Sequence, residues 1–223
     1  WRLIKAEALV LGRLTNQDSG RFELQFQLFD VFGEKSFSKV LEISHQFDQL
    51  IGVKFHSTNS MEFELLKNAA DNFEIIFISI SGLTAVEIFE LYEFIKNTNS
   101  FGKFVFSYGV QTYPTELKDI KLNKLTELRR IFDIPIGLSE HLDGDLQIAK
   151  DIIKYAWLLG YEYIEKHVTL DRSRRLDDDH SALELSELVE AIHELENISE
   201  VFTNDVLRLT DSEVSYRNNA KKV

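Results

Sequence analysis

Two segments decide the fold: IPIGLSEHLDGD at residues 134–145 and YEYIEKHVTLDRSRRLDDDH at residues 161–180. Each begins as a short apolar strand and ends in polar residues that include a histidine. The stretch between them, residues 145–159, has the apolar spacing of an amphipathic helix. A strand, a helix and a second strand in this order form the basic unit of a parallel sheet.

Each of these strands carries its histidine together with polar partners. Side chains on a strand alternate with a period of two, so residues two positions apart point to the same face. The residues that share a face in this way are Gly137, Ser139 and His141 on the first strand and Tyr163, Glu165 and His167 on the second. Polar residues that gather at the carboxyl ends of parallel strands indicate a site, because the core below them is apolar.

Composition narrows the class of protein. The chain has 223 residues, of which 44% are hydrophobic and 28% charged, enough for one sizeable core in a single domain. The net charge of -12 argues against nonspecific binding to nucleic acid or to an anionic membrane. There is no cysteine, so His, Asp and Glu remain as strong metal ligands. No apolar run approaches a membrane span, and the first residues lack the order of a signal peptide, so we expect a cytoplasmic protein.

The first residue is Trp1 rather than methionine, and we therefore expect the chain to be part of a longer protein. Within it we predict a barrel-type domain over residues 1–198. A polar tail or linker, expected to be extended, follows over residues 199–223.

Strand-like and helix-like segments alternate along the chain, which predicts a parallel α/β sheet. Besides the two strands already quoted, the candidate strands cover residues 3–11, 22–29, 52–58, 75–80 and 103–110. The clearest candidate helices cover residues 61–69, 85–95, 117–132 and 183–195. A closed (β/α)8 barrel needs eight strands and about 250 residues, and the first two strands here are joined by a loop with no room for a crossover helix. We predict an incomplete TIM-type (β/α)8 barrel, with an open doubly wound sheet as the alternative.

Four motifs in order carry a resemblance to a known family. They are QTYPT at 111–115, SEH at 139–141, EKHVTLD at 165–171 and DDDH at 177–180. Together they resemble the N-acetylneuraminate (sialic acid) synthase family, which writes these segments approximately as SSYPT, SDHT, EKHFTLD and GPDH. Members condense phosphoenolpyruvate with an N-acylated amino sugar to form a nine-carbon nonulosonic acid. The resemblance implies that activity for this chain.

The resemblance also implies a metal site and catalytic carboxylates. The family's two metal-ligand histidines fall on His141 and His167, and Mn²⁺ or Mg²⁺ would suit the oxygen-rich remainder of the shell, although imidazole also admits zinc. The carboxylates fall on Glu165, on Asp179 of the DDDH motif, and on Glu7 in a segment similar to the family's first strand.

Substrate contacts are implied at four further residues. Ser139 and Thr58 match residues that contact phosphate, Tyr113 matches the tyrosine of the YPT motif, and Gln111 stands where the family has asparagine. Phosphoenolpyruvate and an amino sugar are therefore the expected ligands. We also expect a homodimer, because an incomplete barrel would expose apolar edges that a partner should cover.

Two lysines of the family's substrate site are missing. The second strand has Gln25 and Gln27 around Phe26 where the family has Lys-Phe-Gln, and the fourth strand offers Phe77 or Ile78. Charge-assisted contacts to a multiply charged ligand are among the strongest available, so this loss matters.

The third strand offers a replacement for that charge. Lys54, His56 and Thr58 share a face, so we predict that Lys54 partly replaces the missing lysines, while Arg172 and its neighbours could add charge at the rim. Two functional classes stay open: an active nonulosonate synthase, or a weakened homologue that binds a sugar acid, a metal or a partner subunit without turnover.

Overall fold

The structure is a computed structural model. It describes residues 9–13, 28–44, 52–161, 163–174, 179–202 and 207–220.

Six parallel strands form the body of the sheet in the described part of the chain. In spatial order they are β2 (Leu28–Val31), β3 (Gly52–Phe55), β4 (Ile75–Ser79), β5 (Phe104–Tyr108), β6 (Ile136–Ser139) and β7 (Tyr163–Thr169). Two more strands share the far edge of β7. These are β1 (Leu9–Arg13), which runs antiparallel to it, and the short β8 (Leu183–Glu184), which runs parallel. The sheet curls so far that β1 also contacts β2. The fold is an α/β half-barrel of six parallel strands, which is consistent with the predicted incomplete barrel.

The first strand does not join the parallel set. β1 pairs antiparallel with β7 in the register Leu9 to His167 through Arg13 to Tyr163. An alternating apolar pattern is the same in parallel and antiparallel edge strands, so the sequence of β1 carries no signal for its direction.

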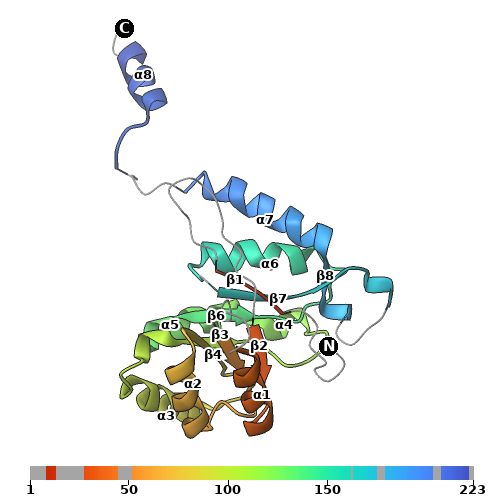
Figure 1. Cartoon of the computed structure of the whole chain (residues 1–223). Coiled ribbons are helices and arrows are strands. Elements are labelled where there is room, and N and C mark those ends of the chain that lie inside the picture. Colours follow the sequence, from red (N-terminus) through yellow and green to blue (C-terminus); the bar gives the residue numbers. More distant parts are fainter. Residues whose placement is uncertain are drawn as a thin grey trace.

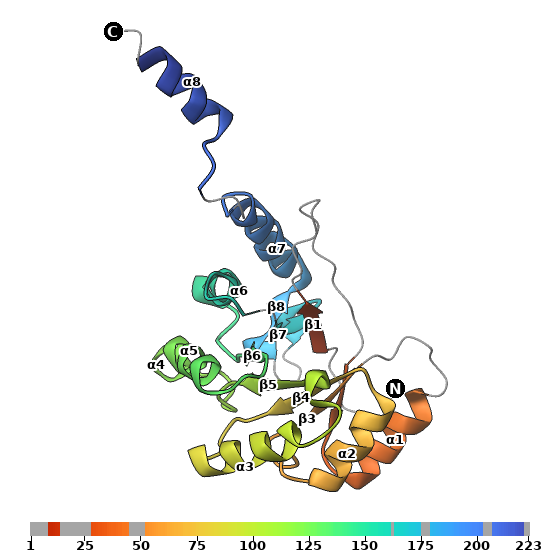
Figure 2. The same ribbon diagram turned by 90° about the vertical axis from the view of Figure 1, so that its left-hand side faces the viewer.

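Helices cover the outer side of the curled sheet (Figures 1 and 2). They are α1 (Glu34–Ser44), α2 (Phe63–Asn72), α3 (Ala85–Lys96), α4 (Leu117–Ile120), α5 (Leu122–Ile131), α6 (Gln147–Leu158) and α7 (Leu185–Ser199). The last helix, α8 (Asp211–Ala220), stands apart from the sheet (Figures 1 and 2). Short 3₁₀ turns, η1 (Phe101–Lys103), η2 (Arg172–Arg174) and η3 (Asp179–Ser181), complete the described elements. None of the described helices is long and apolar enough to cross a membrane.

Two helical predictions need correction. The segment predicted as one helix over 117–132 is broken into α4 and α5 at Lys121, whose φ of 48° lies in the left-handed region. The tail predicted as extended contains α8, which begins at a reciprocal cap. Glu213 N donates to Thr210 Oγ1, and Thr210 N donates to Glu213 Oε2. α8 itself has no buried residue.

The two faces of the sheet differ in chemistry. The outer face packs against the helices through fully buried apolar side chains such as Ile76, Ile78 and Phe106. The inner face has an apolar floor of Phe77, Val105 and Tyr163, which form a cluster of their own. Polar residues follow above this floor, toward the carboxyl ends of the strands, so this end of the sheet is where a site can form.

Candidate metal centre and active site

The two predicted histidines and Glu165 lie together inside the half-barrel. His141 follows the end of β6, while Glu165 and His167 lie on the inner face of β7. One ligand atom from each of the three residues lies within 4.8 Å of the others, and the two imidazole centroids are 5.0 Å apart. His141 and Glu165 are only 1% and 3% exposed. The period-two reading of both strands thus corresponds to side chains that meet in space.

Two atoms of this cluster are buried without a hydrogen-bond partner among the described residues: Glu165 Oε2 and His167 Nε2. An unpaired buried polar atom costs about 1–3 kcal/mol, and most such atoms in folded proteins are paired. A carboxylate oxygen and an imidazole nitrogen that share one centre form the donor set of a divalent cation. The cluster therefore fits a metal ion.

A backbone carbonyl fixes the tautomer of His141, the third residue of the cluster. His141 Nδ1 lies 2.8 Å from the carbonyl oxygen of Val110, which can only accept, so Nδ1 carries the proton. Its Nε2 is left with a lone pair, as in protein metal sites where a carbonyl orients the ligand imidazole. Burial lowers the pKa of His141, and burial together with His141 lowers the pKa of His167 to about 4. Both rings are neutral at pH 7, the form that binds a metal.

Lys54 reaches Glu165 across the inside of the barrel. It lies on β3, which is separated from β7 in the sheet by β4, β5 and β6. Its Nζ is nevertheless 2.6 Å from Glu165 Oε1. Ser139 Oγ donates to the same oxygen at 3.0 Å. Burial alone would raise the pKa of Glu165, but the charge and hydrogen bond of Lys54 outweigh it and the pKa is lowered. Glu165 is thus an anchored carboxylate with one oxygen paired and the other beside the histidines.

Tyr113 forms a wall of the site at the end of β5. Its ring centroid is 4.2 Å from that of His141 and 5.8 Å from that of His167, and the residue is 44% exposed. Its hydroxyl donates to Gln111 Oε1 at 3.2 Å, and a cis peptide bond joins it to Pro114. Tyr113 and Gln111 therefore stand beside the histidines, between the cluster and solvent.

Ser79 and Ser81, which sequence reasoning missed, link the ends of β4 and β5. Ser81 Oγ accepts hydrogen bonds from Gly109 N at 3.2 Å and Gln111 Nε2 at 3.5 Å, and Ser79 Oγ lies 3.1 Å from it. A Cβ at Gly109 would lie 1.6 Å from the carbonyl oxygen of Ser139, so the chain passes too close there for any other residue. The sequence does contain a pattern that could have identified them, because the two serines alternate with isoleucines at the end of a buried strand.

Other predicted residues lie around the cluster rather than in it. Thr58 lies in the turn after β3, where its hydroxyl donates to Asn59 Oδ1 at 2.9 Å. Asp179 is buried at the start of η3, and the same turn contacts the site through Ser181 Oγ, which donates to the His141 carbonyl at 3.0 Å. Glu7, with Gln25 and Gln27, lies outside the described residues.

The structure shows where Arg172 lies and what occupies the place of the missing fourth-strand lysine. Arg172 is engaged in ion pairs with Asp145 and Glu187 rather than presented freely at the rim. Phe77, one of the two residues that could match the family's fourth-strand lysine, points into the barrel and packs edge-on against Tyr163, with 5.3 Å between the ring centroids. The other position, Ile78, lies in the core under the helices.

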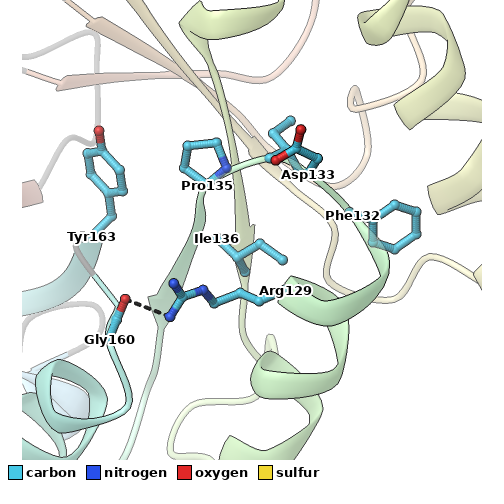
Figure 3. A pocket seen from close by; sticks show the side chains of 8 residues that line it. Arg129, Phe132, Asp133, Pro135, Ile136, Gly160 and Tyr163 are labelled. Carbon is cyan, nitrogen blue, oxygen red and sulfur yellow. Dashed lines mark hydrogen bonds between the residues drawn. The ribbon is translucent and has the colours of Figure 1, made fainter.

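A pocket of about 280 Å³ lies at the opposite, amino ends of β6 and β7 (Figure 3). Its lining residues are Arg129, Phe132, Asp133, Ile134, Pro135, Ile136, Gly160 and Tyr163. Arg129 Nη1 donates to the carbonyls of Gly160 at 2.8 Å and Leu159 at 3.1 Å, so its guanidinium holds the end of α6. The pocket contains none of the predicted site residues.

Comparison with known proteins assigns the chain to a family. The sequence profile described as the NeuB family matches residues 39–206, well over half of the chain. The chain belongs to the NeuB family. The resemblance to sialic acid synthases that the four motifs carry is confirmed. A second profile, the TolB amino-terminal domain, matches residues 1–37, so Glu7 lies outside the NeuB match.

Relatives of this NeuB-family chain include named synthases. Human N-acetylneuraminate-9-phosphate synthase is 28% identical over 164 residues, which cover 73% of this chain and 44% of that protein. Pseudaminic acid synthase of Campylobacter jejuni is 28% identical over 160 residues, covering 70% of this chain and 45% of that protein. The chain thus spans less than half the length of these curated relatives.

A solved structure shares the fold. The crystal structure of N-acetylneuraminic acid synthetase from Leptospira borgpetersenii serovar Hardjo-bovis, in complex with citrate, is 27% identical with a TM-score of 0.69. The match covers 87% of this chain and 65% of that one.

Proposed function

We propose that this chain carries the site of a phosphoenolpyruvate-dependent condensation with an N-acylated amino sugar, which forms a sialic-acid-like nonulosonic acid. The observation that carries the proposal is the convergence of Glu165 Oε2 and His167 Nε2, both buried and unpaired among the described residues, beside His141. Relatives that are synthases of N-acetylneuraminate 9-phosphate and of pseudaminic acid support it.

The reaction joins two carbon atoms and releases inorganic phosphate. A carbon–carbon bond forms between the methylene carbon of phosphoenolpyruvate and the aldehyde carbon of the open-chain sugar, and the aldehyde oxygen takes a proton. Water then adds to the carbon that bears the phosphate. The bond from that carbon to the bridging oxygen breaks, inorganic phosphate leaves with this oxygen, and a 2-keto acid remains.

His141, Glu165 and His167 would hold a divalent cation, with Mn²⁺ or Mg²⁺ as the first choices and zinc also compatible with imidazole ligands. When bound, such an ion would polarise the aldehyde oxygen and orient the attacking water. Glu165 is ionised and anchored by Lys54 and Ser139, so its second oxygen is suited to hold the ion, either directly or through a ligand water. The partly exposed ring of Tyr113 would limit the access of solvent to the two histidines.

Substrate oxygens would meet hydroxyl and amide groups on the neighbouring strand ends. Thr58, Gln111 and Ser139 are proposed for this role on the family resemblance, and Ser81 joins them because it bonds to Gln111. Asp179 and Glu7 stay proposed as acid–base groups, the first because it is buried in the turn that contacts His141.

Lys54 is the proposed source of positive charge for the anionic substrate. It is 5% exposed at the inner face and already pairs with Glu165, so phosphate or carboxylate would approach it beside that residue. We expect Lys54→Ala to raise the KM for phosphoenolpyruvate and Lys54→Arg to retain more of the wild-type affinity. Unchanged phosphoenolpyruvate affinity in an active Lys54→Ala protein would remove Lys54 from the substrate site.

The proposed activity is tested by phosphate release. Protein is incubated with phosphoenolpyruvate, Mn²⁺ and a panel of N-acylated hexosamines, and inorganic phosphate is measured for the wild type and for a double variant, His141→Ala with His167→Ala. We expect sugar-dependent release that the double variant loses by at least about a hundredfold, since ligand removal takes away the polarising ion. His193→Ala, an exposed histidine on α7, is the matched control and keeps wild-type activity. Sugar-independent release, or release that survives loss of both histidines, contradicts the proposal.

A second function is supported by one specific observation. Phe77, one of the two residues that could match a substrate-binding lysine of the family, fills the interior of the half-barrel. A chain with that position closed could bind a metal and a sugar acid without turnover. No phosphate release with any sugar, from folded wild-type protein that binds Mn²⁺, would favour this binding function.

A further inference from the structure

A buried ion pair lies directly behind the histidines, on the outer face of the sheet. Lys166 Nζ donates to Glu140 Oε1, and the two side chains are 3% and 0% exposed. The second carboxylate oxygen of Glu140 accepts a hydrogen bond from Leu142 N at 2.6 Å. Neighbouring residues of the same face, Leu138 and Ile164, belong to the apolar core. A buried pair in such a layer adds little stability, because desolvation offsets the attraction between the charges.

The position of the pair along the strands suggests another role. β6 and β7 are paired through Leu138 with Ile164 and through Ser139 with Glu165, and β6 ends there. One residue beyond this last pair, Glu140 stands beside Lys166. His141 and His167 come one residue later on their segments, beyond the part of β6 that pairs with β7. The ion pair is therefore the link between the strands that lies nearest to the histidine level, and its bond to Leu142 N also holds the backbone that follows His141.

We propose that Glu140 and Lys166 are positioning residues, which set the distance between His141 and His167 and so tune the affinity of the site for a divalent metal. Their side chains face away from the cavity and act through the two strands. The inference rests on the proposed metal centre. Groups that orient metal ligands from outside the ligand set typically change metal affinity by about 10–100-fold when they are removed.

The test removes both charges at once. The double variant Glu140→Gln with Lys166→Met leaves no unpaired buried charge, and replacing a whole buried pair is usually tolerated by the fold. Mn²⁺ affinity is measured by titration with detection of the free ion, and the visible absorption of bound Co²⁺ reports the ligand geometry. We expect Mn²⁺ binding about 10–100-fold weaker than in the wild type, with shifted Co²⁺ bands, in a variant whose circular dichroism is that of the wild type.

A second ion pair supplies the matched control. Lys154 on α6 pairs with Glu194 on α7, away from the histidines. The same exchange there, Lys154→Met with Glu194→Gln, should leave Mn²⁺ affinity and the Co²⁺ spectrum unchanged.

Three outcomes would overturn the inference, and they are distinguishable. A folded Glu140→Gln, Lys166→Met variant with wild-type Mn²⁺ affinity and Co²⁺ spectrum overturns the positioning role alone. If that variant does not fold, Lys166→Arg, which keeps the charge but changes its reach, is measured instead, and wild-type values again overturn the role. Wild-type protein that binds neither ion overturns the metal centre itself, and this inference with it.

Discussion

At the scale of single residues, the site depends on which buried polar atoms have partners. Glu165 shares one oxygen with Lys54 and Ser139 and keeps the other beside His167. Removing the Lys54 charge would leave a buried carboxylate without its cation, which costs roughly 3–5 kcal/mol. We predict that Lys54→Met lowers the free energy of unfolding by about that amount, measured by urea denaturation. Lys54→Met combined with Glu165→Gln should recover most of the loss. Wild-type stability in the single variant would show that the pair does not exist in solution.

The alternation of side chains predicted which residues share a face, and Ser139 does meet Glu165 across β6 and β7. It could not predict the partner of Lys54, which lies 111 residues away along the chain. That contact depends on how far the sheet curls, and no local pattern encodes the curl. The carbonyl of Val110 that orients His141 was equally hidden, because every residue offers a carbonyl.

At the scale of elements, one ion pair joins the loop after β7 to the start of α7. Glu187 accepts hydrogen bonds from Arg172 at 2.6 and 3.1 Å, and these lower its pKa below the ordinary 4.5. A carboxylate with a lowered folded-state pKa contributes its full stability above the unfolded pKa and loses it as the pH falls through the folded pKa. We predict that Glu187→Gln lowers the free energy of unfolding by about 1–2 kcal/mol at pH 7, and that the difference from wild type disappears at an acidic pH below the lowered folded-state pKa of Glu187.

Urea denaturation at the two pH values measures this difference. Glu190→Gln is the control, since Glu190 is 59% exposed and its pair with Lys150 should contribute little. An equal loss at both pH values for Glu187→Gln would contradict the ion-pair account.

Sequence patterns located most elements and missed their interruptions. The predicted helix at 85–95 matches α3, which begins at the capping box of Thr84 and Glu87. The helix break at Lys121 could not be predicted from the sequence, because a lysine gives no indication that its φ will be positive. The cap of α8 could be predicted, because Thr210 is followed three residues later by Glu213. The helix itself has too few apolar residues to suggest a packed element.

At the scale of the whole molecule, the curled sheet brings together strands that are distant in sequence, and a bound ion would tie them. His141 follows the end of β6 and Glu165 lies on β7, so an ion bound by both would link the two segments, and an ion that binds only the folded chain adds to its stability. We predict that Mn²⁺ at about 100 times its Kd raises the free energy of unfolding by about 2.7 kcal/mol, and that a chelator removes the gain. Thermal melts measure the shift. An equal shift in the variant with both His141→Ala and His167→Ala would show that the ion acts elsewhere.

The half-barrel was predictable from the count and spacing of strands, whereas the assembly remains a prediction. Exposed apolar side chains such as Phe32, 61% exposed beside β2, favour the expected homodimer. Sedimentation of the purified protein should give twice the mass of one chain, and a monomer at all concentrations would contradict this expectation.

The central claim is a metal centre on His141, Glu165 and His167, and it is tested most directly by anomalous X-ray scattering from crystals soaked in Mn²⁺. We predict one strong anomalous peak within bonding distance of Glu165 Oε2, His167 Nε2 and His141 Nε2. A fully soaked crystal with no peak there, or with its strongest peak at other residues, would contradict the metal centre and the proposed condensation chemistry with it.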